Sequence, residues 1–317
     1  YRTPTSIPVI YLVLAFFMAF SWFCIVFAAV GSFAREPTCL LQMAPPNSMN
    51  QVNTLKIAVY TENIGGYDEV RMEDIPSVPS GMDAFYFADS ETLKKHKNAF
   101  ALWRKNGWTT MEYRDMQQGT KQVSGQRLTA KKVKFDPPDW ITEGKWDWLV
   151  HFDAQQHVLL EKLPSFIQQR SNASLILQSW CHNLRPCCSQ GGLACFQAEA
   201  GKFRGRDRLR IENASQEYFQ WVSDVTEMVK NSTLLLPQYF EGNIFMRNLK
   251  SKYSGEVKKA FKEVFEANRK VPRDQPFLAV FLEKHGLNAE IITVEQSTLK
   301  RSIGFPGPRG VLHTMLN

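Results

Sequence analysis

Short apolar runs alternate with longer amphipathic stretches through most of this chain, and this pattern predicts its fold class. Short apolar runs bounded by turn residues are typical of buried strands, whereas the longer stretches are typical of helices. Strands that alternate with helices form a mainly parallel sheet with helices on both faces, so we expect an α/β protein. We expect strands at 55–61, 83–89, 108–113, 146–153, 174–179, 233–237 and 289–294, and helices at 91–106, 128–135, 215–230, 254–269 and 273–284.

The carboxyl ends of the predicted strands carry the first candidate site residues. Ligands of such sheets bind beyond these ends, where the predicted strands place Thr61, Asp89 and Asp153. Asp153 is the strongest candidate, because a carboxylate after an apolar strand can hold a divalent cation that neutralises a leaving diphosphate. An acid at this position can also simply cap a turn. The metal role is weakened by Gln155, which stands where a second acid would make the motif more specific.

Several enzyme classes and partners are not supported by the sequence. The chain has no phosphate-binding loop of the Walker type, no Gly-x-Gly-x-x-Gly and no Gly-x-Ser-x-Gly. Their absence argues against P-loop enzymes, dinucleotide-binding enzymes and hydrolases with a nucleophile elbow. The net charge of +7 suits an anionic partner such as a nucleotide phosphate, or simply a basic solvated surface. Because like charges form no long run, a nucleic-acid-binding tail is not expected.

The start of the chain predicts a membrane anchor. No charged residue occurs from Thr3 to Ala34. A membrane-spanning helix needs about 20 mostly apolar residues, whereas the apolar core of a cleaved signal has only about 7 to 15. We therefore expect an uncleaved transmembrane signal anchor at 1–34, a stem rich in Pro, Asn and Gln at 35–54, and one domain at 55–317.

Four of the six cysteines lie close together, at Cys181, Cys187, Cys188 and Cys195. Behind a membrane signal, such clustering favours disulfides in an oxidising lumen, although no pairing follows from the sequence. His182 lies within the cluster and leaves zinc as the alternative, but the spacing matches no common zinc motif.

Three Asn-x-Ser/Thr sequons are compatible with a luminal domain. Together with the predicted anchor and disulfides, they predict a single-pass type II protein of the Golgi or endoplasmic reticulum membrane. The sequons begin at Asn172, Asn213 and Asn231.

A series of landmarks runs in order along residues 55–295. They are Tyr60-Thr61, Gly65-Gly66-Tyr67-Asp68, Phe87-Ala88-Asp89, Ala130–Lys134, Trp148–Asp153, His182 and Arg185 with the later Glu199, Asn243 with Arg247, and Arg273-Asp274-Gln275. In type, order and spacing these landmarks resemble a family of plant and algal Golgi glycosyltransferase-like proteins. That family was long known as a domain of unknown function and includes mucilage-polysaccharide proteins. The resemblance covers almost all of the predicted domain.

The resemblance implies an enzyme that transfers a sugar from a nucleotide-sugar donor to a glycan or glycoprotein acceptor. It implies a single GT-A-like, Rossmann-like catalytic domain at 55–317. Asp153 would face the donor diphosphate, with Mn²⁺ or Mg²⁺ left open as a cofactor, and Glu199 or Asp274 would orient or deprotonate the acceptor hydroxyl. The donor would contact Thr61, Gly65, Gly66, Asp89, Lys131, Lys134 and Arg247, and the acceptor or the frame of the site would involve His182, Arg185, Asn243, Arg273 and Gln275.

One departure from the family motif bears on function. The family usually has Asp-Gly-Asn where this chain has Asp153-Ala154-Gln155, which keeps the acid but puts metal dependence in question. A non-catalytic glycan-binding relative therefore stays open. A metal-dependent lipid-amide hydrolase is a further alternative, because some relatives of this family have been discussed as such hydrolases. The hydrolase would use His151, His157 and His182 as candidate ligands, and their spacing is not a zinc signature.

Overall fold

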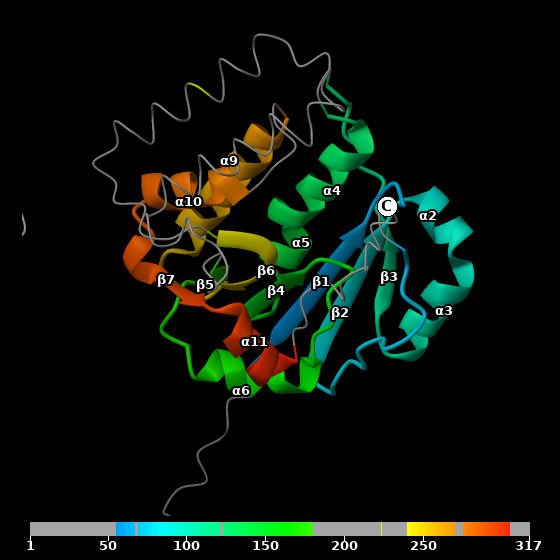
Figure 1. Ribbon diagram of the computed structural model, residues 1–317, viewed down its shortest axis with the longest axis horizontal. Helices are drawn as coiled ribbons and strands as arrows, with labels where there is room; N and C mark the ends of the chain where they lie inside the picture. The colour runs from blue at the N-terminus through cyan, green and yellow to red at the C-terminus, as the bar shows by residue number, and fades with distance from the viewer. Residues whose placement is uncertain are drawn as a thin grey trace, which may run out of the picture. The chain divides into compact units, whose positions relative to one another are not determined.

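A seven-stranded sheet runs through the part of the chain that the structure describes (Figure 1). The structure is a computed structural model, and it describes residues 55–66, 69–120, 123–179, 240–269 and 275–304, together with Ser223. The strand order is β3-β2-β1-β4-β6-β5-β7. The strands are β1 (Ile57–Asn63), β2 (Met82–Ala88), β3 (Thr109–Glu112), β4 (Trp148–Phe152), β5 (Leu175–Ser179), β6 (Phe240–Asn248) and β7 (Ile291–Val294).

The sheet is mixed, and most of its pairs are parallel. β1 pairs in parallel with β2 and β4, β2 with β3, and β5 with β7, whereas β6 runs antiparallel between β4 and β5. The predicted α/β class and mainly parallel sheet are confirmed to this extent. The sequence pattern does not predict β6, because Glu241, Gly242 and Asn243 interrupt its apolar run, and glycine and polar residues lower the strand signal.

Helices cover both faces of the sheet, as the alternation predicts (Figure 1). The helices α4, α9 and α10 contribute to one buried cluster, and α3, α6 and α11 contribute to another on the opposite face. All five residues of β4 are buried, as is typical of a parallel strand covered on both sides. The helices are α2 (Ser90–Lys95), α3 (Lys97–Lys105), α4 (Gly125–Phe135), α5 (Asp139–Thr142), α6 (Leu163–Gln168), α9 (Ser254–Asn268), α10 (Gln275–Lys284) and α11 (Gln296–Ile303), with short 3₁₀ turns at η1 (Leu160–Lys162) and η3 (Asn288–Glu290).

Several element boundaries differ from the sequence-based expectation. The helix predicted at 91–106 is two helices, because His96 leaves the helical conformation, with φ −108° and ψ 32°. The helix predicted from residue 128 begins at Gly125, since the Ser124 side chain accepts a hydrogen bond from the Arg127 N–H and caps it. The short helices α5, α6 and α11 are not predicted. The strand predicted at 233–237, and the helix predicted at 215–230 apart from the helical Ser223, lie outside the described ranges.

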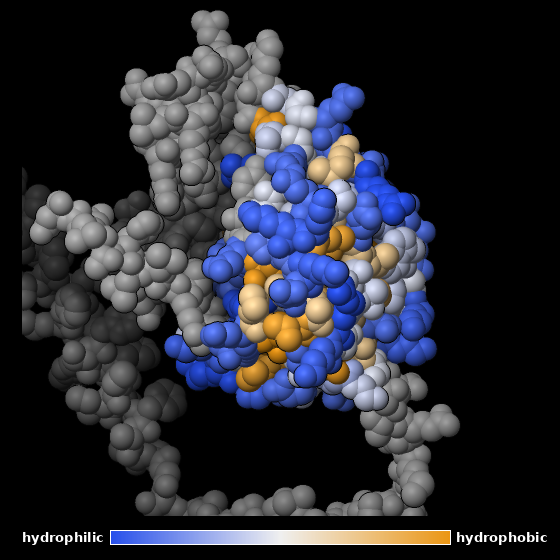
Figure 2. All heavy atoms as spheres, turned by 90° about the vertical axis from the view of Figure 1, so that its right-hand side faces the viewer, coloured by the Kyte–Doolittle hydropathy of each residue, from blue (hydrophilic) through white to orange (hydrophobic). Residues whose placement is uncertain are grey.

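The surface on the side of α2, α3 and β3 is mostly hydrophilic, with a group of apolar residues near the centre of the view and others scattered over this face (Figure 2). A patch of this kind is ordinary on a folded domain. None of the helices within the described ranges is both long and apolar enough to cross a membrane. The predicted anchor at 1–34 and stem at 35–54 lie outside those ranges.

Candidate active site at the carboxyl edge of the sheet

The order of the strands changes direction between β1 and β4. From β1 the chain adds β2 and then β3 on one side, and it later places β4 on the other side of β1. Open α/β sheets bind ligands outside the carboxyl ends of the strands at such a switch point. Glu62 lies near the end of β1, and Asp153 directly follows β4. Two acids therefore stand on either side of the switch point.

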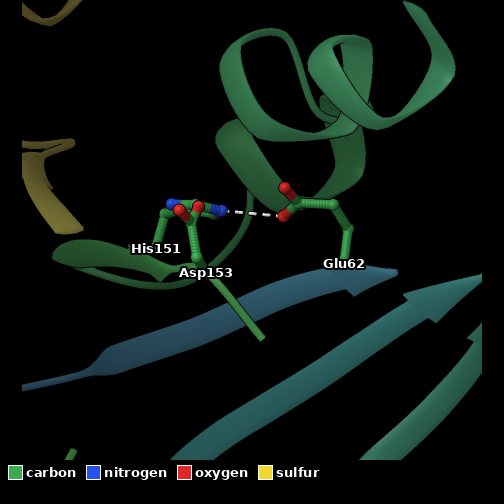
Figure 3. A group of neighbouring side chains, drawn as sticks. All are labelled: Glu62, His151 and Asp153. Carbon is green, nitrogen blue, oxygen red and sulfur yellow. Dashed lines mark hydrogen bonds and ion pairs between the residues drawn. The ribbon is translucent and has the colours of Figure 1, made fainter. Parts of the chain in front are cut away.

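A group of three side chains converges at this edge (Figure 3). Glu62, His151 and Asp153 each offer one potential ligand atom, and these atoms lie within 4.8 Å of one another. The strand register explains the meeting, because Tyr60 of β1 lies opposite His151 of β4. Side chains two positions apart lie on the same face of a strand. Glu62 therefore lies on the same face as Tyr60, and Asp153 on the same face as His151, so all of them share one face of the sheet.

Lys134 on α4 completes the group. Its Nζ lies 2.8 Å from Asp153 Oδ1, and the side chains of Lys134 and Asp153 are 5% and 20% exposed. The Tyr60 hydroxyl donates a 2.6 Å hydrogen bond to the Lys134 carbonyl and so fixes α4 on β1. Helix side chains lean toward the helix N-terminus, and the first turn of α4 lies at the carboxyl edge, where Gln126 contacts Gly65. Lys134 therefore reaches back along α4 to Asp153.

A basic stripe precedes Lys134 on the same helix. Arg127, Lys131 and Lys134 stand at positions i, i+4 and i+7, a spacing that puts side chains on one face of a helix. The N-terminus of a helix also carries a partial positive charge that favours anions. The edge of the sheet next to Asp153 is therefore a place of positive potential.

His151 positions Glu62. The imidazole is fully buried, stacks on Phe245 at 4.6 Å between centroids, and lies edge-on to Tyr60 at 5.0 Å. Burial, together with the positive charges of Lys134, Arg247 and Lys131, holds the pKa of His151 well below its usual value, although Asp153 acts in the opposite sense. The imidazole is therefore neutral, and its Nε2–H donates to Glu62 Oε2 at 2.7 Å.

Arg247 brings a positive charge beneath the site. It lies on β6 with 3% exposure, and its guanidinium is 5.1 Å from the centroid of the Phe261 ring. Its Nε and Nη2 have no hydrogen-bond partner among the described residues. Burial raises the pKa of Tyr60 well above its usual value, while Arg247, which hydrogen-bonds Tyr60, acts against that rise. Arg247 thus affects the site from within the core and not from its open edge.

The loop after β1 is anchored by Asp89. Its carboxylate accepts hydrogen bonds from the N–H of Gly65, and from the N–H of Thr92 at 2.8 Å and its hydroxyl at 2.9 Å. Burial would raise the pKa of Asp89, but these hydrogen bonds outweigh it and lower that pKa below its usual value. Gly65 and Gly66 have φ of 78° and 61°, a conformation that favours glycine.

The remaining predicted site residues fall into two groups. Thr61 is fully buried inside β1, and its Oγ1 has no hydrogen-bond partner within the ranges described. The Asn243 carbonyl accepts a 2.9 Å hydrogen bond from the Asp153 N–H and so holds the turn after β4. Gln275 is the first residue of α10. The roles predicted for Thr61 toward the donor, and for Asn243 and Gln275 toward the acceptor or the frame of the site, stay predictions. Outside the described residues lie Glu199, Asp274, His182, Arg185, Arg273, Asn213, Asn231 and all six cysteines.

Sequence reasoning missed Glu62 as a site residue. The first predicted strand ends at Thr61, so Glu62 falls in the loop, whereas β1 continues through Asn63. The signal that could have found it is the period of two, which places an acid on the same face as Tyr60. Its partner His151 entered the prediction only as a metal ligand of a hydrolase, and the structure gives it a hydrogen bond to Glu62 instead.

The three convergent side chains do not fit a divalent metal as they stand. Two carboxylates and an imidazole have suitable donor atoms, but His151 Nε2 is engaged by Glu62 and Asp153 by Lys134. A cation on Asp153 would lie about 4 Å from the ammonium, where each pair of unit charges repels by about 4 kcal/mol at an effective dielectric constant of about 20. For a divalent ion the repulsion is roughly twice as large. The arrangement fits an ion pair and not a metal centre.

A hollow of about 330 Å³ lies at the other edge of the sheet. It is lined by residues of α5, the end of β6 and the start of α9, and Asn248 in its wall pairs with Trp148 at the amino end of β4. Its Lys258 is already paired with Asp139 and Glu143, at 3.0 and 2.7 Å. Because ligands of these sheets bind at the carboxyl edge, we place the candidate site there and not in this hollow.

No model of a known protein family matches the chain, and no curated protein matches it. Three similar solved structures are the glycosyltransferase GlyE of Streptococcus pneumoniae, the galactosyltransferase LgtC, solved with donor and acceptor sugar analogues, and the mannosyltransferase Ktr4p of S. cerevisiae. Their identities to the chain are 9%, 12% and 11%, and their TM-scores are 0.37, 0.40 and 0.38.

The three matches cover 76%, 75% and 80% of the chain, and 45%, 73% and 70% of the respective structures. The chain thus spans less than half of the length of GlyE. TM-scores below 0.5 are too low to carry a function, which has to rest on the residues of the site.

Proposed function

We propose that this protein is a glycosyltransferase that moves a sugar from a nucleotide-sugar donor to a glycan or glycoprotein acceptor. One observation carries the proposal: the Lys134–Asp153 ion pair stands at the switch point between β1 and β4. Ligands with a nucleotide and a diphosphate bind at such points in α/β sheets. The landmarks that resemble the Golgi glycosyltransferase-like family supply the sugar-transfer part of the proposal.

The reaction needs positive charge on its leaving group. The bond between the anomeric carbon and the diphosphate oxygen breaks, a bond to the acceptor oxygen forms, and the acceptor proton passes to a carboxylate. Lys134 and Lys131 balance the charge that collects on the diphosphate, since lysines on a fixed helix stabilise such charge with little reorganisation. Glu62, fixed by His151, accepts a hydrogen bond from a donor hydroxyl. Glu199 or Asp274 takes the acceptor proton, as the family resemblance implies.

A non-catalytic glycan-binding relative is the second candidate, and the Asp153-Ala154-Gln155 motif favours it. It could keep the same edge of the sheet and the same ion pair. Turnover of a nucleotide sugar distinguishes the two, because a binding protein releases no nucleoside diphosphate. A zinc-dependent hydrolase would need the histidine-containing group to take a metal, which its present hydrogen bonds oppose.

Nucleotide sugars should stabilise the protein against heat. A ligand at one hundred times its Kd adds about 2.7 kcal/mol to the free energy of unfolding, which for a domain of this size raises Tm by roughly 5 to 10 °C. The test is a thermal-shift panel of UDP- and GDP-sugars with the full 317-residue chain, purified in detergent, followed by assay of sugar transfer. Uridine and guanosine are the matched controls, since they lack the diphosphate. If no nucleotide sugar stabilises the chain, the proposed function is wrong.

The proposed function also places the domain in the lumen of the Golgi or the endoplasmic reticulum, behind a single-pass type II anchor. Asn172, which opens a sequon, is exposed in the turn after α6, where a glycan has room. We expect an endoglycosidase to lower the mass of the protein made in eukaryotic cells, and Asn172→Gln to remove one glycan from it. Asn248→Gln, which changes an asparagine outside any sequon, is the control. An unglycosylated chain with all thiols free would contradict this placement.

A further inference from the structure

We infer that Lys134 supplies the fixed positive charge at this site in place of a divalent cation, and that it binds the diphosphate of a nucleoside-diphosphate ligand directly. The inference rests on the proposed function and names how its donor is held. An enzyme that releases a diphosphate can neutralise it with a metal ion or with lysine and arginine side chains. The geometry around Asp153 decides between these two solutions.

The Lys134 ammonium is fixed from both ends of its ion pair. On its own side, α4 is bound to β1 through the hydrogen bond from the Tyr60 hydroxyl to the Lys134 carbonyl. On the other side, the Asp153 N–H donates to the Asn243 carbonyl at 2.9 Å, which holds the carboxylate over the end of β4. The Asp153 carboxylate thus fixes the Lys134 ammonium next to the end of β4. A fixed positive charge stabilises a phosphate group at the carboxyl edge with little reorganisation.

The charges around the site also favour an anion over a cation. The basic stripe of α4 contributes Lys131 and Lys134, and Arg247 adds a positive charge from the core, beside the carboxylates of Glu62 and Asp153 and a neutral His151. Cation sites in proteins instead collect an excess of carboxylates. The set of possible metal ligands is also incomplete. The Asp153 carboxylate already pairs with Lys134, and the Glu62 carboxylate already accepts a hydrogen bond from His151.

Asp153 thus has a different role from the metal ligand that its place in the sequence suggests. It positions Lys134 and keeps the ammonium at the carboxyl edge, while the diphosphate contacts the lysine.

The first test measures Mn²⁺ alone, by electron paramagnetic resonance, on the full chain. Wild type should leave the spectrum of free Mn²⁺ unchanged. Lys134→Met removes the ammonium from the Asp153 carboxylate and should gain saturable Mn²⁺ binding, which Lys134→Met/Asp153→Asn should lose again. Lys132→Met is the matched control, because Lys132 lies on the same helix and pairs with Asp136 away from the site. Stoichiometric binding of Mn²⁺ to wild type that Asp153→Asn abolishes would overturn the inference.

The second test measures binding of UDP and GDP by calorimetry, with excess EDTA and again with Mn²⁺. Wild type should bind one of them equally well in both conditions. Lys134→Met should weaken that binding at least about tenfold, since a hydrogen bond to a charged group is lost, while Lys132→Met should not. Lys134→Arg, which keeps the charge, separates this loss from a folding defect and should retain part of the affinity.

The outcomes of the two tests distinguish the inference from the proposed function. Loss of nucleotide binding in EDTA overturns the inference and leaves the proposed function standing. Failure of wild type to bind UDP, GDP or any nucleotide sugar overturns the proposed function and the diphosphate half of the inference. In that case the Mn²⁺ titration still decides whether Lys134 excludes a cation from the site.

Discussion

Asp153→Asn should lower the rate of sugar transfer by at least about a hundredfold, the scale expected when a key electrostatic contact of an active site is lost. The substitution removes one negative charge and keeps the size of the side chain. In the wild-type protein the Asp153 carboxylate holds the Lys134 ammonium at 2.8 Å. Without it the ammonium is no longer fixed at the carboxyl edge, so the charge that we propose to balance the diphosphate is misplaced.

The same variant should also lose stability. Exposed ion pairs contribute about 0–1 kcal/mol, whereas breaking a buried pair costs about 3–5 kcal/mol. With Lys134 5% exposed and Asp153 20% exposed, this pair lies between the two, so we expect a loss of roughly 1–3 kcal/mol. Urea titration followed by an activity assay on the folded protein measures both effects separately.

Asp136→Asn is the matched control for Asp153→Asn. It breaks another lysine–aspartate pair of α4, that of Lys132 and Asp136, which is also partly buried, at 24% and 14% exposure. Asp136→Asn should cost a similar amount of stability, because it breaks a similarly buried pair, and it should leave the transfer rate within about twofold of wild type, because that pair lies away from the candidate site. If Asp153→Asn is as active as Asp136→Asn, the diphosphate lies elsewhere and the candidate site is wrongly placed.

The position of Asp153 at the end of a buried strand could be predicted from the sequence, whereas contacts between several elements could not. Asp153 could be found because it ends an apolar run that only a buried strand explains. Lys134 could be named as a basic residue near a diphosphate, but its pairing with Asp153 depends on how α4 lies on β1. That packing is fixed by a hydroxyl–carbonyl bond between residues 74 positions apart, which no local pattern reveals.

The strands of the sheet differ in how clearly the sequence predicts them. β1 and β4 are buried on both faces, so their continuous apolar runs are strong signals. β6 lies equally deep in the sheet, but Gly242 and the polar residues beside it conceal it. The mixed character of the sheet follows from β6, and so does the position of Phe245 under the site. The support that β6 gives to His151 is therefore one part of the site that the sequence could not predict.

Phe245→Ala tests that support, and it should reduce both stability and ligand binding. The Phe245 side chain is fully buried at the centre of β6. Its ring stacks on His151 at 4.6 Å, lies 5.9 Å from Phe135 of α4, and meets Phe261 of α9 edge-on at 4.9 Å. Truncating a buried aromatic residue to alanine costs about 3–5 kcal/mol, part of which comes from the cavity that is left. That is a large share of the stability of a typical domain.

A loss of ligand binding should distinguish Phe245→Ala from the same substitution at another buried phenylalanine. Phe100, 1% exposed, lies on the opposite face of the sheet and packs edge-on against Tyr86 at 5.0 Å. Phe100→Ala should therefore cost a similar amount of stability, because it leaves a cavity of similar size. In Phe245→Ala, however, the ring that holds His151 in place is gone, so Glu62 loses its fixed partner and the folded protein should bind the nucleotide more weakly. Titrating both variants with the same nucleotide, well below their melting temperatures, compares them directly. Equal nucleotide affinities in the two variants would mean that Phe245 only fills the core, and that the Glu62–His151 pair takes no part in binding.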